Sequence, residues 1–185
     1  GSQVPDISNL ATQFDISPSI EPSHGTVLLN LDTGEPVHHW VELDARHQEG
    51  EPMLFFIRTI EGLDHGAAYA VAISGLVDGG ESISPSEGFR ALRDNISTDN
   101  QGIEAQRSAY ETMFSSFEEF GVERSNMQSA WWFHTASTES ILEDILIMRD
   151  DAEERLGSEG IACTISEVVE DYGDDDNTLR LIRGT

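Results

Sequence analysis

The chain has 185 residues, of which 38% are hydrophobic, and its 35 acidic against 10 basic residues give a formal net charge of −25. All ten basic residues are Arg, and no basic patch is available to displace counterions from nucleic-acid phosphates or to bind anionic headgroups. We therefore expect no nucleic acid as a partner, and binding to anionic membrane surfaces is disfavoured. No apolar run reaches the length of a membrane span, and we expect no membrane insertion.

Alternating apolar residues predict short antiparallel strands in the first half of the chain. Residues 1–24 are interpreted as the remnant of an expression tag, Gly1-Ser2, followed by a loose N-terminal segment. Asp32-Thr33-Gly34 predicts a turn that joins a strand to a partner strand directly after it. The continuous apolar run of the third strand predicts burial on both faces. The expected strands occupy residues 27–31, 37–43, 53–60 and 68–74.

The apolar spacing becomes helical in the second half of the chain. One or two helical turns are expected at 85–92, and a long helix from Gly102 to Gly121, where the glycine ends it. A second long helix begins at Ser137 or Thr138 and ends at Gly157. Between the two long helices, residues 129–135 predict a strand, and further strands are expected at 161–169 and 179–182.

The three consecutive aromatic residues of the 129–135 strand point to alternating faces. Trp131 and Phe133 are expected in the core. Trp132 then faces the other side, where it either packs under a helix or lines a binding surface.

These patterns predict an α+β fold, an antiparallel Ig-like β-sandwich or sheet with two amphipathic α-helices packed on it. We expect one domain over residues 25–185. Its β-rich part covers 25–92, and a helical insertion with the closing strands covers 93–185.

The pattern Leu63-x-x-Gly66-x-x-Tyr69-x-Val71-x-Ile73, followed by Gly-Leu-x-Asp, resembles the last hairpin of bacterial Ig-like domains. The later segments Phe89–Asp94, Ala130–Ser140 and Ile147–Ala152 are similar to a series in the N-terminal region of large secreted lipase- and esterase-like proteins. In those proteins this region precedes an α/β-hydrolase region. The resemblance implies that the chain is one piece of a longer secreted or cell-surface protein, that its partner is the hydrolase region, and that no catalytic centre lies in the piece.

A serine hydrolase of the α/β type needs a Gly-x-Ser-x-Gly elbow. The nearest approaches, Ser86-Glu-Gly88 and Ser158-Glu-Gly160, lack the leading glycine. His134 and Ser137 form a Ser/His pair in sequence only, and a strand-end histidine followed by a helix-capping serine accounts for both residues.

Two groups of residues are candidate metal ligands. His38, His39 and His47 lie near Glu42 and Asp44, but without a zinc-binding spacing, and exposed polar positions are the favoured interpretation. The acidic run Glu170–Asn177 offers the oxygen ligands that calcium takes, but it does not match the EF-hand spacing, and a solvated acidic loop is the favoured interpretation. The alternative hypothesis is a calcium site at Asp174, Asp175 and Asp176.

The expected function is that of a non-catalytic accessory or scaffolding module of a secreted lipase- or esterase-like hydrolase. The alternative is a cell-surface adhesion or binding module, calcium-dependent if the acidic loop is a site. The excess of Asp and Glu in the absence of Lys indicates adaptation to salt. The single cysteine, Cys163, is expected to be a buried, inert thiol.

Overall fold

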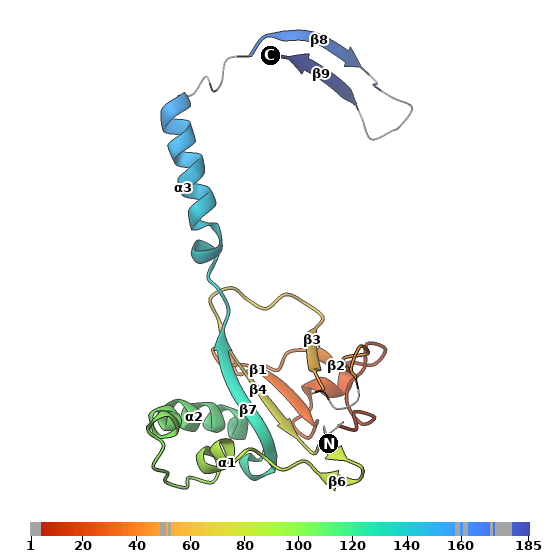
Figure 1. The fold of residues 1–185 in the computed structure, drawn as a ribbon, viewed down its shortest axis with the longest axis vertical. Coiled ribbons are helices and arrows are strands. Elements are labelled where there is room, and N and C mark those ends of the chain that lie inside the picture. Colours follow the sequence, from red (N-terminus) through yellow and green to blue (C-terminus); the bar gives the residue numbers. More distant parts are fainter. Residues whose placement is uncertain are drawn as a thin grey trace. The chain divides into compact units, whose positions relative to one another are not determined.

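The computed structural model describes residues 5–48, 51, 53–157, 160, 163–170, 172 and 179–185. The chain divides into two compact units, Gly1–Thr138 and Glu139–Thr185. The described part is mixed α+β, with antiparallel sheets and three α-helices (Figure 1). The boundary between the two units follows Thr138. The sequence predicted its internal division, between the β-rich part and the helical insertion, at residues 92 and 93.

The centre of the first unit is a three-stranded antiparallel sheet in the order β1-β4-β7. Its strands are β1 (Thr26–Asn30), β4 (Ala68–Ser74) and β7 (Met127–His134). The uncharged β4 is buried along nearly its whole length, as a central strand requires. Strand β1 pairs with β4, which follows it by about forty residues in the sequence; Leu28 lies opposite Val71.

The predicted pairing of the first two strands is only partly correct. The turn after β1 does form, since the backbone N–H groups of Asn30 and Val37 donate to Glu35 and Leu28. Beyond Val37, however, β2 (His39–Leu43) leaves β1 and pairs with β3 (Phe55–Thr59) in a separate two-stranded sheet. The burial predicted for β3 on both faces is wrong, because an apolar cluster covers the face of Phe55 and Ile57, and the residues of the strand are half-buried or exposed.

Helices α1 (Glu87–Arg93) and α2 (Gln101–Phe120) pack on one face of the three-stranded sheet (Figure 1). The Asn100 side chain caps the start of α2 by accepting from the N–H groups of Gly102 and Ile103. Gly121 ends the helix in the left-handed conformation, at φ 103°. The side chains buried between helices and sheet include Leu29, Ala70, Phe89, Met113, Phe114, Phe117 and Met127.

The β2–β3 sheet lies on the opposite side of the three-stranded sheet from the helices (Figure 1). The second apolar cluster includes Leu10, Leu28, Val41, Tyr69, Val71 and Ile73, with Phe55, Ile57 and Phe133 packed against it. Short elements complete the unit: η1 (Ser17–Ile20), β5 (Val77–Asp78), β6 (Glu81–Ser82) and η2 (Arg124–Asn126).

The second unit consists of most of α3 (Thr138–Leu156) and the hairpin of β8 (Ile165–Glu170) and β9 (Arg180–Gly184). Helix α3 forms where its cap and period predict it, but its apolar residues are exposed. The expectation that a long helix packs on the sheet is confirmed for α2. Cys163, predicted to be buried, is exposed.

Candidate functional site

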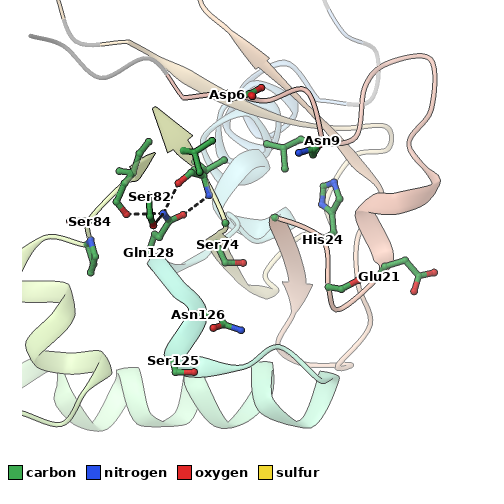
Figure 2. A pocket seen from close by; sticks show the side chains of 18 of the residues that line it. Asp6, Asn9, Glu21, His24, Ser74, Ser82, Ser84, Ser125, Asn126 and Gln128 are labelled. Atoms are coloured by element: carbon green, nitrogen blue, oxygen red, sulfur yellow. Dashed lines mark hydrogen bonds between the residues drawn. The ribbon is translucent and has the colours of Figure 1, made fainter. Parts of the chain in front are cut away.

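An open cavity of about 840 Å³ lies in the first unit, between the N-terminal segment, the β4–β6 region and the start of β7 (Figure 2). Its wall is mostly polar, and the labelled side chains around it come from segments far apart in the sequence. These are Asp6, Asn9, Glu21, His24, Ser74, Ser82, Ser84, Ser125, Asn126 and Gln128.

Gln128 holds one wall of this cavity together. Its Nε2 donates to the carbonyls of Leu76 (2.8 Å) and Ile83 (2.7 Å), and its Oε1 accepts from the Leu76 N–H (2.7 Å). Figure 2 draws these bonds as dashed lines. A side-chain amide that makes three such bonds is fixed in orientation, so Gln128 acts as a structural tie between β7 and the β4–β6 region.

The opposite wall contains His24, which is almost fully buried and belongs to a pair of histidines joined through Thr26. His24 Nε2 accepts from the Ala11 N–H (2.9 Å), so its Nδ1 carries the proton and donates to the Thr26 carbonyl (2.7 Å). His39, fully buried, donates from Nδ1 to the Val37 carbonyl (2.8 Å) and accepts at Nε2 from the Thr26 hydroxyl (2.9 Å). Burial first, and the nearby His24 as a lesser cause, lower the pKa of His39 below its ordinary value.

Both ring nitrogens of each histidine are therefore already hydrogen-bonded within the fold. A histidine in this condition stabilises packing and has no lone pair left for a metal or a proton transfer. The favoured prediction that the histidines of this region occupy exposed positions is wrong for His39. The cavity beside His24 has the size and polarity to hold a small polar ligand, without a side chain set up for covalent chemistry in the wall described above.

The carboxylates of the predicted histidine-rich region are used in other ways. Glu42 accepts from the Trp40 indole (3.1 Å) and pairs with Arg58, and these bonds lower its pKa. Asp44 pairs with Arg46 at 3.1 Å. Within the described ranges, no three His, Cys, Asp or Glu side chains come together as a metal site would require.

The serines considered for catalysis have different positions. Ser86 caps α1, since its hydroxyl accepts from the Phe89 N–H (3.2 Å). Ser158 lies outside the described residues. His134 lies edge-on to Trp132, with ring centroids 5.4 Å apart.

The predicted calcium ligands Asp174, Asp175 and Asp176 also lie outside the described residues. The first residue of the acidic run, Glu170, ends β8 and forms an ion pair with Arg180 of β9 at 2.8 Å.

The aromatic residues of β7 are only partly placed as predicted. Phe133 packs in the second cluster and stacks on Tyr69, with the ring centroids 5.8 Å apart. Trp131 was expected beside it in the core but is 39% exposed, because β7 is the edge strand and one side of its face has no neighbouring strand. Trp132 lines an open groove with Ile103 and Tyr110 of α2 and is 37% exposed.

The sequence predicts the apolar stripe of α3 as a core face, and the exposure of this stripe is what sequence reasoning missed. We name it the α3 face; its exposed members are Ile141, Leu142, Ile145, Leu146, Met148 and Leu156. In the hairpin, Val168 and Ile182 pair across the strands and are also exposed. The helical period predicted the apolar face, but a period cannot say whether a covering surface exists.

Comparison of the chain with family models, with curated proteins and with solved structures finds no match in any of the three. Among the described residues, no helix is both long and apolar enough to cross a membrane.

Proposed function

We propose that this chain is a non-catalytic accessory module of a secreted or cell-surface lipase- or esterase-like protein, and that its second unit docks against the hydrolase region. The α3 face is the observation that carries the proposal. It gathers six large apolar side chains, each at least 39% exposed, along one side of a helix of 19 residues. An apolar surface of this density normally marks a site where another protein surface packs.

The hairpin beside this helix in the sequence supports the same proposal. A two-stranded hairpin is at best marginally stable on its own in water. Only Val169 and Leu181, which pair across β8 and β9, are half-buried among its described residues. A partner that covered α3 and extended the hairpin would supply the core that this unit lacks.

An Ig-like arrangement of the first unit belongs to the proposal as well. Two β-layers, β1-β4-β7 and β2–β3, enclose the second apolar cluster, in the manner of a small sandwich.

Amide hydrogen exchange tests the docking. The purified chain is compared with the longer protein encoded by its gene, and we expect the amides of α3 to exchange at least about tenfold more slowly in the longer protein, because docking adds to the free energy of local opening. Equal exchange in the two proteins, or a gene product without a hydrolase region, would contradict the proposal.

A variant of the longer protein sharpens this test. Ile145→Glu with Met148→Glu places two charges on the α3 face, and the added protection should be lost. The matched control is Leu54→Glu, an equally exposed apolar residue of the first unit, which should leave α3 protected.

The open polar cavity beside His24 favours the second candidate, a surface binding module. Its calcium dependence rests on Asp174, Asp175 and Asp176. Titration calorimetry with calcium tests this candidate, since a calcium-dependent binding module predicts a heat of binding and the accessory module predicts none.

A further inference from the structure

Strand β7 has the position of an edge strand and the composition of an interior one. It is the last strand of the order β1-β4-β7. The fourteen residues Ser125–Thr138 around it contain no Asp, Glu or Arg, although 24% of the chain is charged. Proteins usually protect an exposed sheet edge with charged side chains, because an unprotected edge pairs with other strands.

The other described strands follow that rule. The uncharged strands β1 and β4 are covered on both edges: β4 is central, and residues Glu35 and Val37 hydrogen-bond along the outer edge of β1. Each of the remaining edge strands carries a charge. These charges are Glu42 in β2, Arg58 in β3, Asp78 in β5, Glu81 in β6, Glu167 and Glu170 in β8, and Arg180 and Arg183 in β9. Among the described strands, β7 is thus the one uncharged edge.

The hydrogen bonds identify which part of this edge is open. The carbonyls of Met127 and Ala130 are occupied by Arg93 (2.8 Å) and by the Tyr110 hydroxyl (3.2 Å). The Thr135 N–H donates to Ala67, toward β4. The backbone N–H and C=O groups of successive residues point alternately toward and away from the neighbouring strand. The N–H and C=O groups of Trp132 and His134 therefore point away from β4.

We propose that β7 pairs antiparallel with the β7 strand of a second copy of this chain, so that two three-stranded sheets become one continuous six-stranded sheet. Antiparallel pairing about a twofold axis at Phe133 places Trp132 of each copy opposite His134 of the other. Each such pair exchanges two backbone hydrogen bonds, which gives four in total. On one face of the joined sheet, the half-exposed Trp132 side chains of the two copies become diagonal cross-strand neighbours. On the other face, Trp131 of each copy lies opposite Thr135 of the other.

The charge distribution favours a second copy as the occupant. Two molecules that each carry −25 repel one another wherever acidic side chains meet. The fourteen uncharged residues around β7 allow two copies to come together with no like charges opposite one another within the paired strands. The pairing uses the first unit alone, and it is independent of the docking proposed for α3.

Amide exchange and sedimentation test the pairing on the purified chain in about 0.5 M salt, where the screening length is short and repulsion between the two copies is weak. We expect dimers, and protection of the Trp132 and His134 amides that increases with protein concentration, whereas the inward-facing Trp131 and Phe133 amides are protected at every concentration. A chain that stays monomeric up to about 1 mM, or a dimer with no added protection at Trp132 and His134, would overturn the proposal.

Matched variants separate this contact from association through α3. Trp132→Glu should weaken the dimer at least about tenfold. The double variant Trp132→Glu/His134→Lys restores it, because the new charges lie opposite one another in the Phe133-centred register. Leu54→Glu and the pair Ile145→Glu/Met148→Glu should leave the dimer unchanged. Loss of the dimer in the α3 variant alone would refute pairing at β7 and leave the docking of α3 to its own test.

Discussion

At the scale of single residues, Thr26 holds two buried histidines at once. Its carbonyl accepts from His24 and its hydroxyl donates to His39, so the hydrogen bonds of both imidazoles are satisfied in the neutral form. A proton added to His39 Nε2 would meet the Thr26 hydroxyl inside a nearly dry interior. The lowered pKa of His39 is the consequence, since burial penalises the charged ring.

This pKa shift predicts a loss of stability in mild acid. Below an unfolded pKa of about 6.5 the unfolded chain binds a proton at His39 that the folded chain does not, so the free energy of unfolding falls as pH decreases toward the folded pKa. One such proton contributes at most about 1.4 kcal/mol per pH unit. In urea unfolding between pH 7.5 and 5, His39→Gln should have a shallower pH slope than the wild type. The same replacement at exposed His65 is the control, and an unchanged slope in His39→Gln would refute the assignment.

At the scale of elements, Arg124 fastens α1, α2 and η2 to one another. Its guanidinium forms two bonds to the Glu111 carboxylate (2.7 and 2.6 Å), donates to the Leu92 carbonyl at the end of α1 (2.9 Å) and lies 4.2 Å from the centre of the Phe114 ring. Glu111 is partly exposed, so solvent screens the ion pair. The carbonyl bond and the ring contact therefore carry more of the effect.

We expect Arg124→Ala to lower the free energy of unfolding by about 2 kcal/mol, and Arg124→Lys to recover only part of it, because an ammonium cannot make the planar forked contact. Chemical denaturation measures both. Arg90→Ala, on the exposed side of α1, is the control and should change stability by no more than about 0.5 kcal/mol. An Arg124→Lys variant as stable as the wild type would show that the charge alone matters.

Elements whose signals are local were predicted well from the sequence. Helix α2 was expected from Gly102 to Gly121 and runs from Gln101 to Phe120, because its cap, its apolar period and its terminal glycine all lie within it or beside it. The strand predicted to pair with β1 was wrong. The nearby turn favoured β2, whereas the actual partner, β4, is distant in the sequence.

The candidate sites depend on such distant contacts even more strongly. The cavity wall draws on residues as far apart as Asp6 and Gln128, which no spacing rule connects. The exposure of Trp131 follows from the edge position of β7, a property of sheet order that alternation along one strand does not contain. The α3 face was visible as a stripe, but the burial of a stripe depends on a second surface.

At the scale of the whole molecule, the acidic excess cannot be neutralised internally. Nine of the ten arginines already form ion pairs with Asp or Glu, and those pairs are mostly on the surface. With 35 acidic residues, most carboxylates have no cationic partner in the chain. Their mutual repulsion favours the expanded, unfolded state at low ionic strength.

Salt should therefore raise the melting temperature of this protein. Between low salt and about 1 M, where the screening length falls to ~3 Å, we expect a continuous increase in Tm, measured at low protein concentration so that association at β7 does not contribute. The double variant Glu118→Gln/Glu119→Gln, on the exposed side of α2, removes two negative charges and should melt higher at low salt with a smaller response to added salt. A Tm that stays flat or falls over this range would show that self-repulsion does not limit the fold, because every carboxylate pair on the surface weakens as the solution screens it.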